Sequence, residues 1–318
     1  MIAIFGRLAA LAAALVCSTA LAQYPNKPIR IIVPFPAGGT TDLIARIMQP
    51  KFAEHFGQLL LIENRSGAGG SIGAAETARS APDGYTLLMV FDTHAINHYL
   101  YKTAPDPFKT LEHISLMVTS PSALVAVTSY APNNLKEIVA HAKANPEKVT
   151  YSTPGSGSSN HLAALILERY GGIKMTQVAY KGGGPMITAL LSQEVNISFF
   201  SMPLMLPHIK AGKMKGIAVG SRQRTAQLPD VPTLGETYPG FEQISWFGIL
   251  GPVGLPREVV ARVHRETVRT LQVPEVRGKL VEQGFEIVAS TPEEFLRFVQ
   301  AESEKLGKVI RDNGVKVE

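Results

Sequence analysis

Residues 29–42 read IRIIVPFPAGGTTD, a β-branched run followed by prolines, a glycine pair and a Thr-Thr-Asp segment. The apolar run predicts a buried strand over residues 29–35. Apolar residues then recur at helical spacing up to Phe56. A helix is expected there, and Pro50 should kink it or start a new helix because proline lacks the backbone donor. Strand, glycine-rich turn and helix in this order predict an α/β unit.

The same unit recurs along the chain. Strand, loop and helix patterns occupy residues 59–80, 148–170 and 175–191, and the part of the chain from Pro256 onward has mainly helical spacing. Such alternation is typical of parallel sheets. The sequence therefore predicts an α/β fold of two lobes, each a sheet flanked by helices, with a ligand cleft between them.

No Pro/Ser-rich linker separates the lobes, so we expect strands to join them. Apolar residues 114–118 with 124–127, and residues 216–220, are the expected crossings. Lobe 1 is then discontinuous. The predicted division is a signal peptide over 1–22, lobe 1 over 23–121 plus 227–318, and lobe 2 over 122–226.

Composition and the N-terminus narrow the function classes. Apolar residues make up 45% of the 318 residues and charged residues 18%, which excludes a disordered chain. The net charge is +5, but the basic residues are scattered, so no nucleic-acid partner is expected. Arg7, an apolar run and the small-x-small pattern of residues 20–22 (ALA) predict a signal peptide cleaved before Gln23, hence a periplasmic protein. The single cysteine, Cys17, lies in that segment, so we expect no disulfide.

Glycine- or serine-rich turns between a strand and a helix are the recurrent feature. They occupy residues 36–42, 66–71, 153–159 and 181–184. Open α/β sheets bind ligands where strands end, and the first turn of a helix has unpaired N–H groups that suit an anion. The alternative is that these turns only connect elements and cap helices.

Three other chemistries receive weaker support. Ser71 lies in a G-x-S-x-G pattern, typical of hydrolase nucleophiles, but not directly after a strand. Residues 67–73 resemble a dinucleotide loop with the wrong spacing. His94 and His98 are four residues apart without an acidic ligand. We therefore expect no metal, no cofactor and no enzyme, and keep an exported serine hydrolase using Ser71 as a remote alternative.

Ten blocks of sequence carry a resemblance to a known family. They are residues 24–30 (YPNKPIR), 33–42 (VPFPAGGTTD), 63–70 (ENRSGAGG), 81–88 (APDGYTLL), 94–97 (HAIN), 157–162 (GSSNHL), 180–182 (YKG), 206–213 (LPHIKAGK), 228–233 (LPDVPT) and 245–248 (SWFG). In this order they resemble the Bug-type receptors, the solute-binding proteins of tripartite tricarboxylate transporters. The resemblance implies a two-lobe periplasmic binding protein, type II-like, that closes around a small carboxylate.

In that family, loops of both lobes hold the carboxylate, which here implies residues 35–41 and 152–159. Their glycines and hydroxyls would bind it without an obligatory salt bridge. The expected ligand-binding residues are Phe35, Ala37, Gly38, Gly39, Thr40, Thr41, Gly69, Asp92, Thr93, His94, Ser152, Thr153, Gly157, Ser158, Ser159, His161, Tyr180, Lys181 and Ser201.

Besides Pro50, which is unusual within the first helix, the chain departs from the family at two places. Ser201 and Met202 stand where many relatives have an acid and an amide, which makes an amino-acid ligand less favoured. Residues 90–93 (VFDT) replace a stretch that is rich in Gly, Ser and Thr in the family, so Phe91 and Asp92 are expected to reshape the pocket.

The leading hypothesis is a monomeric receptor that captures a small mono- or dicarboxylate by lobe closure. It would deliver this ligand to the membrane permease of a tripartite tricarboxylate-type transporter. The alternative is a receptor that feeds a membrane sensor kinase without transport, and the residues do not separate the two.

Overall fold

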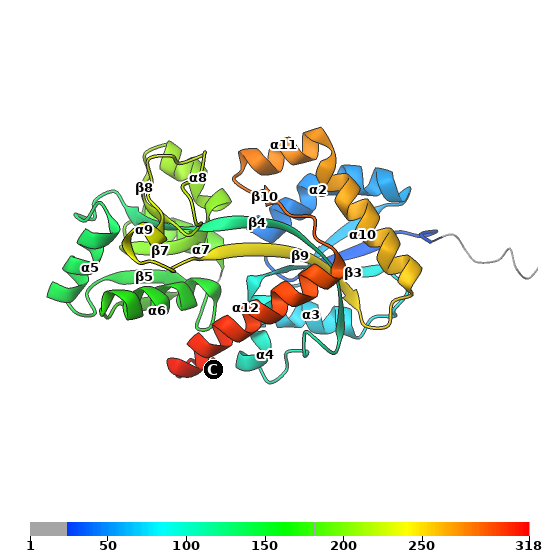
Figure 1. Ribbon diagram of the computed structural model, residues 1–318, viewed down its shortest axis with the longest axis horizontal. Helices are drawn as coiled ribbons and strands as arrows, with labels where there is room; N and C mark the ends of the chain where they lie inside the picture. The colour runs from blue at the N-terminus through cyan, green and yellow to red at the C-terminus, as the bar shows by residue number, and fades with distance from the viewer. Residues whose placement is uncertain (1–23, 181, 318) are drawn as a thin grey trace, which may run out of the picture.

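The computed structural model describes residues 24–180 and 182–317. The predicted signal peptide and Lys181 lie outside the described residues. Figure 1 shows two lobes side by side, with two long strands running between them and helices around each sheet. The α/β fold of two lobes predicted from the sequence is confirmed.

One continuous sheet, in the order β2-β1-β3-β9-β4-β7-β5-β6, extends through the described part of both lobes, and β10 and β8 also pair with β4. Lobe 1 contains β1 (Ile29–Val33), β2 (Leu60–Asn64), β3 (Thr86–Phe91), β9 (Ile244–Pro252) and β10 (Glu286–Ile287). Lobe 2 contains β5 (Thr150–Thr153), β6 (Thr176–Ala179), β7 (Ile197–Ser201) and β8 (Met214–Val219). The long strand β4 (Leu111–Val127) belongs to both lobes.

The strand directions place the carboxyl ends of several strands at the same edge of each lobe. β1 is parallel to β2 and β3, and β5 is parallel to β6 and β7. β4 pairs antiparallel with β9 in lobe 1 and with β7 in lobe 2. The parallel strands are those that the alternating sequence pattern predicts.

Helices cover the sheets. Those of lobe 1 are α2 (Thr40–Phe56), α3 (Ser71–Ala78), α4 (Asn97–Leu100), α10 (Arg257–Gln272), α11 (Pro274–Glu282) and α12 (Pro292–Asp312), with the 3₁₀ turns η1 (Ala68–Gly70) and η2 (Asp92–Ala95). Those of lobe 2 are α5 (Leu135–Ala144), α6 (Ser159–Gly171), α7 (Gly183–Leu191), α8 (Met202–Lys210) and α9 (Leu234–Thr237). Among the helices described, none has the length and apolar character needed to cross a lipid bilayer.

Helix α2 passes through Pro50 without ending, so of the two expected outcomes, a kink or a new helix, a new helix does not form. Proline removes one backbone hydrogen bond, but Met48 and Phe52 on either side of it are fully buried in the core of lobe 1. The burial of these two side chains stabilises the helix by several times the energy of one net hydrogen bond.

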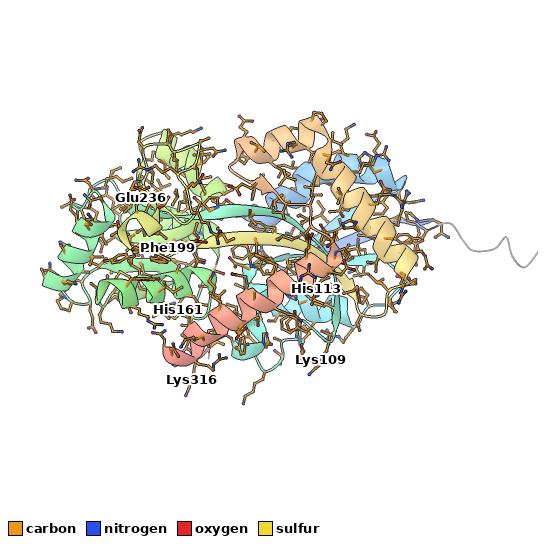
Figure 2. The ribbon with its side chains drawn as sticks, in the orientation of Figure 1. Lys109, His113, His161, Phe199, Glu236 and Lys316 are labelled. Atoms are coloured by element: carbon orange, nitrogen blue, oxygen red, sulfur yellow. The ribbon has the colours of Figure 1, made fainter. Side chains whose placement is uncertain are left out.

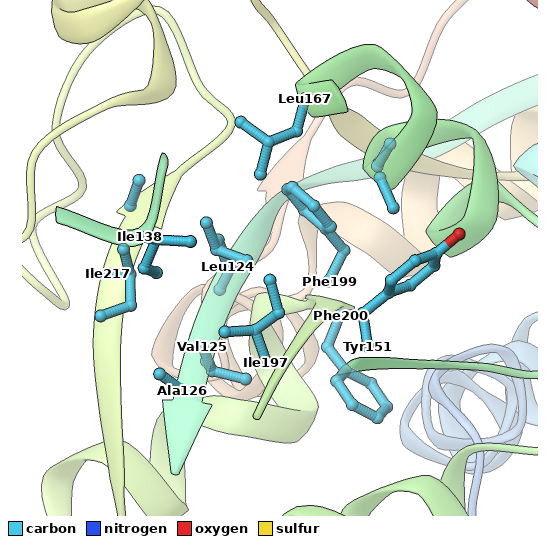
Figure 3. Close-up of a cluster of buried hydrophobic side chains, with 14 of the residues drawn as sticks. Leu124, Val125, Ala126, Ile138, Tyr151, Leu167, Ile197, Phe199, Phe200 and Ile217 are labelled. Carbon is cyan, nitrogen blue, oxygen red and sulfur yellow. The ribbon is translucent and has the colours of Figure 1, made fainter. Parts of the chain in front are cut away.

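Each lobe has its own apolar core. The core of lobe 2 surrounds β7, where Phe199 points toward α6 and Phe200 toward the opposite side of the strand (Figure 3). Leu228, Leu234 and Phe241 are buried in that same core, although residues 227–243 are expected in lobe 1. The expected crossing at residues 216–220 is instead β8, paired with β4 inside lobe 2. We propose that the chain returns to lobe 1 at β9.

Helix α12 contacts both lobes. Near its start, Phe295 packs edge-on against Trp246 of lobe 1. Toward its end, Leu306 and Ile310 belong to the same buried cluster as Leu162 of α6, and Arg169 lies 3.6 Å from Asp312. α12 therefore packs on lobe 1 and on α6 of lobe 2 (Figure 1).

Candidate ligand-binding site

A cavity of about 400 Å³ lies between the lobes, at the carboxyl ends of β1, β3, β5, β6 and β7. Residues 35–41 and Phe91 of lobe 1 line it. From lobe 2 it takes Pro154, Asn160, residues 182–187, Phe200, Ser201 and Leu204. Two hollows of about 520 and 510 Å³ lie away from the strand ends, beside α6 and the end of α12. Since α/β sheets bind ligands at strand ends, the cavity between the lobes is the candidate site.

The wall from lobe 1 is the turn between β1 and α2. Gly38 has a φ of 80°, a conformation that other residues adopt at a cost, and its N–H donates to Asp42 Oδ2 at 2.9 Å. Asn64 donates to Asp42 Oδ1 and to the Phe35 carbonyl, each at 3.0 Å. The turn is thereby held in one shape, with the first turn of α2 directed at the cavity.

Asp42 remains ionised at this position. Its burial opposes ionisation, but hydrogen bonds from the Arg46 guanidinium, the Gly38 N–H and Asn64 outweigh that effect and lower the pKa of Asp42. A carboxylate in the first turn of a helix is also stabilised by the helix dipole. Because Arg46 lies 2.8 Å from it, the charge of Asp42 is compensated outside the cavity.

The wall from lobe 2 is the start of α7. Gly182, the N-cap residue, has a φ of 94° and provides no side chain to cap the helix. No side chain caps α2 at Gly39 either. The first N–H groups of a helix have no partner within it, so the start of α2 and the first two residues of α7, Gly183 and Gly184, present backbone donors at one cavity, whereas Pro185 has no N–H.

The two walls approach one another closely. A methyl group added at Gly182 would lie 3.6 Å from Cγ of Pro36, which is van der Waals contact between residues of different lobes. Ser201 completes the polar lining from the end of β7, and its buried Oγ makes no hydrogen bond within the described residues. No described side chain that lines the cavity is charged.

Aromatic and aliphatic side chains form the remainder of the lining. Phe35 and Phe91 meet edge to face, with ring centroids 5.8 Å apart and planes at 88°. Phe91 packs in turn on Phe247, at 5.2 Å, inside lobe 1. From lobe 2 come Phe200 and Leu204. The arrangement therefore combines backbone donors for an anion with an apolar wall of fixed geometry.

Comparison with known proteins identifies the family of this chain. The model of the tripartite tricarboxylate transporter family receptor matches residues 44–315. BugT of Bordetella pertussis is 33% identical over 298 residues, which cover 92% of this chain and 91% of BugT. The chain belongs to this receptor family. The resemblance to Bug-type receptors stated from the sequence is confirmed.

Solved structures agree. The periplasmic binding protein BugD has a TM-score of 0.86 and 32% identity, covering 92% of this chain and all of BugD. R. palustris Rpa4515 with adipate has a TM-score of 0.87 and 30% identity, over 92% of this chain and 100% of that one. MatC from Rhodopseudomonas palustris with bound malate has a TM-score of 0.83 and 29% identity, over 90% and 100%.

Part of the expected receptor site lies together in the cavity. Phe35, Ala37, Gly38, Gly39, Thr40, Thr41 and Ser201 all line it. The loop over residues 181–184 is also there through Gly182, Gly183 and Gly184, whereas Lys181 lies outside the described residues. Tyr180 packs against the core of lobe 2. The role of these residues in ligand binding remains a prediction.

The facing loop differs from the family-based expectation. Residues 152–159 place only Pro154 on the cavity, and residues 182–187 lie opposite α2 instead. Ser158 caps α6, accepting from the His161 N–H and donating to the Gly155 carbonyl. Thr153 Oγ1 accepts from Gln177, at 2.7 Å. These hydroxyls therefore satisfy backbone and side-chain partners within lobe 2.

Other expected residues of lobe 2 lie behind the cavity. Ser152 is fully buried in β5. A Cβ at Gly157 would lie 2.4 Å from Leu100 of lobe 1, so this glycine permits the two lobes to touch. His161 Nδ1 accepts from the Gly157 N–H, and burial lowers the pKa of His161. Figure 2 shows His161 and His113 in different lobes.

Asp92 joins the lobes instead of lining the cavity. Its carboxyl group is buried, accepts a hydrogen bond from Ser159 of α6, and has a raised pKa because burial disfavours its charged form. Thr93 Oγ1 donates to the Gly69 carbonyl at 2.8 Å, which fixes η1 to η2. His94 is buried beside His113, with ring centroids 6.1 Å apart. The sequence could not separate such inner contacts from ligand contacts.

Neither the serine hydrolase nor a metal site finds support among the described residues. Ser71 is the first residue of α3, buried, and its Oγ has no hydrogen-bond partner in the described chain, so no histidine pairs with it. Within residues 24–180 and 182–317, no group of three His, Cys, Asp or Glu side chains is placed to hold a metal ion.

Some lining residues were not expected at all. Asn160 donates from its side chain to the Phe199 carbonyl, and Met186, Ile187, Phe200 and Leu204 contribute apolar surface. Their apolar character indicates core packing in the sequence, and only the position of β7 relative to α7 reveals that they face a cavity.

Proposed function

We propose that the chain is a periplasmic receptor that binds a small organic carboxylate between its lobes and delivers it to the permease of a tripartite tricarboxylate-type transporter. One observation carries the proposal. The uncapped starts of α2 and α7, from different lobes, face the same cavity. Backbone N–H groups at two helix N-termini suit a carboxylate without a cationic side chain.

The solved relatives support the ligand class. Rpa4515 was solved with adipate and MatC with malate, and both cover at least 90% of this chain. A carboxylate is the group that these two ligands share. The cavity volume of about 400 Å³ falls in the usual range for small-molecule sites.

Closure of the lobes is the proposed binding movement. β4 runs through both lobes and β9 pairs with it along residues 111–121, so a hinge at this point would open and close the cavity. Closing would exclude water and strengthen the hydrogen bonds to the carboxylate.

Gly183→Leu tests the site. A Cβ at Gly183 would point toward Leu204 and Phe200, at 3.7 and 3.9 Å, both of which line the cavity. The leucine side chain would occupy the ligand volume, while its helix propensity exceeds that of glycine by roughly 0.8 kcal/mol. Calorimetric titration with adipate, benzoate and hexanoate should show binding by the natural chain and none by the variant.

Gly278→Leu is the matched control. Gly278 lies in α11 with no atom within 4 Å of an added Cβ, so this variant should bind as the natural chain does. If no carboxylate binds to the natural chain, or if Gly183→Leu binds with unchanged affinity, the proposed site is refuted. Deletion of the gene tests delivery. Cells without the gene should lose uptake of the bound carboxylate, because a receptor serving only a sensor kinase would leave uptake intact.

A further inference from the structure

The polar capacity of the cavity is small. Among the described lining residues, only Thr40, Thr41, Asn160 and Ser201 carry polar side chains. Asn160 already donates to the Phe199 carbonyl. The two threonines lie at the start of α2, where the backbone donors are, so the polar groups serve one anionic group and its immediate surroundings.

The apolar lining is continuous with the core of lobe 1. Phe35 meets Phe91 edge to face, Phe91 packs on Phe247, and Phe247 packs edge-on against Phe285 at 5.7 Å. Phe247 and Phe285 are fully buried. The outer two rings therefore present a wall whose position is set by core packing, and a rigid wall costs little entropy when it binds a ligand.

Phe91 is the lining residue through which the cavity wall joins the buried Phe247 of lobe 1. It is the last residue of β3, and its ring is half-buried at the cavity. A small polar residue there would offer a hydroxyl and leave more space. Phe91 offers neither, so it shifts the site toward apolar ligands.

Desolvation decides between ligand classes. A ligand hydroxyl that leaves water needs a protein partner, and burying it without one is unfavourable. Against Phe35, Phe91, Phe200, Ile187 and Leu204 it finds none. A hydrocarbon segment at the same place gains from leaving water.

We propose that the ligand is a carboxylate with a hydrocarbon body, aryl or alkyl, and that Phe91 excludes hydroxylated acids. The inference rests on the proposed function, because it takes the carboxylate as held between α2 and α7. It adds the chemical class of the rest of the ligand and names the residue that selects it.

Matched ligand pairs test the proposal on the full mature chain. Hexanoate and gluconate share a six-carbon monocarboxylate skeleton, and adipate and galactarate share a six-carbon dicarboxylate skeleton; each pair differs only in hydroxyl groups. Calorimetric titration should give a Kd for the hydrocarbon member at least about tenfold below that of its partner, and benzoate should bind in the same range as hexanoate or adipate. Equal or tighter binding of gluconate or galactarate overturns the proposal.

A neutral ligand separates this failure from failure of the proposed function. Hexanamide should bind far more weakly than hexanoate, because it lacks the negative charge. If gluconate and galactarate bind best and hexanamide does not bind, the proposed carboxylate receptor is supported and the proposed preference for a hydrocarbon body is refuted. If hexanamide binds as well as hexanoate, carboxylate recognition falls.

Variants test the wall itself. The preference for hexanoate is the Kd of gluconate divided by the Kd of hexanoate. Phe91→Ser and Ile187→Ser should each reduce this preference by about tenfold. Ile72→Ser, at an exposed position of α3, should leave it unchanged. Ile187 is half-buried on α7, so its variant tests the wall even if Phe91→Ser weakens the fold. An unchanged ratio in a folded Ile187→Ser variant, measured beside thermal unfolding, counts against the proposal.

Discussion

Ser201 is the side chain whose environment points most directly to a ligand. It ends β7, lines the cavity, and its buried Oγ makes no hydrogen bond within the described residues. Buried hydroxyl groups are nearly always paired, so an unpaired one in a residue that lines a cavity is expected to pair with a ligand bound there. Its neighbour Ser198 shows the contrast, because Ser198 Oγ donates to the Ser152 carbonyl at 3.0 Å.

Ser201→Ala should weaken carboxylate binding by about fivefold, the effect of losing one net hydrogen bond of roughly 1 kcal/mol. The unfolding free energy should change little, because this hydroxyl has no protein partner to lose. Titration with hexanoate or adipate, beside chemical denaturation, measures both. Ser192→Ala, at the end of α7 outside the cavity lining, is the control and should bind normally. Undiminished affinity in Ser201→Ala would show that the hydroxyl does not contact the ligand.

At the scale of elements, α12 matters because it packs on both lobes and begins at a strong cap. Thr291 Oγ1 accepts from the Glu294 N–H at 3.2 Å, and Glu294 accepts from the Thr291 N–H at 2.9 Å. This reciprocal pair is a capping box, and Pro292 at the first helical position adds to it. The sequence pair Thr291-Pro292 predicts this start, and the structure has it there.

Thr291→Ala should lower the free energy of unfolding by about 1 kcal/mol, because the first turn of α12 loses its side-chain acceptor. Urea denaturation followed by circular dichroism measures the change. Thr291→Ser keeps the hydroxyl and should lose less than half as much. Equal losses in the two variants would mean that the methyl group, and not the cap, stabilises the helix start.

At the scale of the whole molecule, a buried group of histidines links stability to pH. Burial lowers the pKa of His94 to about 3 and that of His113 to about 4, and it also lowers the pKa of His98. His113 lies between Phe108 and Phe295, with ring centroids at 6.3 and 5.2 Å. Asp106 is the acidic group that faces His98. All three histidines are neutral in the folded chain at neutral pH.

Stability should therefore fall as the pH drops below about 6.5, since the unfolded chain takes up protons there and the folded chain does so only near pH 4 and 3. Between pH 6 and pH 5, His94 and His113 together should cost roughly 2 kcal/mol.

In His113→Phe, the unfolding free energy should depend less steeply on pH. The loss between pH 6 and pH 5 should be smaller than in the natural chain by roughly 1 kcal/mol, because one of the two histidines is gone. Phe108→Leu disturbs the same packing without removing a titrating group, so it should lower stability with an unchanged slope. A His113→Phe slope equal to that of the natural chain would contradict the assignment.

Local pattern accounts for much of what could be predicted. The β-branched run at residues 29–35, the glycine pair Gly38-Gly39 and the periodicity after it determined a strand, a turn and a helix, because these depend on side-chain shape and backbone freedom within a few residues. The same information determined the α/β class, the turn over residues 36–41 as one wall of the cavity, and family membership through motifs in order.

Tertiary structure alone decided which turns meet. Both residues 152–159 and residues 181–184 follow a parallel strand of lobe 2, and their sequences are equally suited to an anion. The pairing of β5 between β6 and β7, and the docking of α6 on lobe 1 through Leu162 and Ser159, turned the first loop toward lobe 1 contacts and left the second opposite α2. The proposed return to lobe 1 at β9 has the same origin, since β9 pairs with β4 between residues 123 to 141 positions apart, a long-range contact that local pattern does not encode.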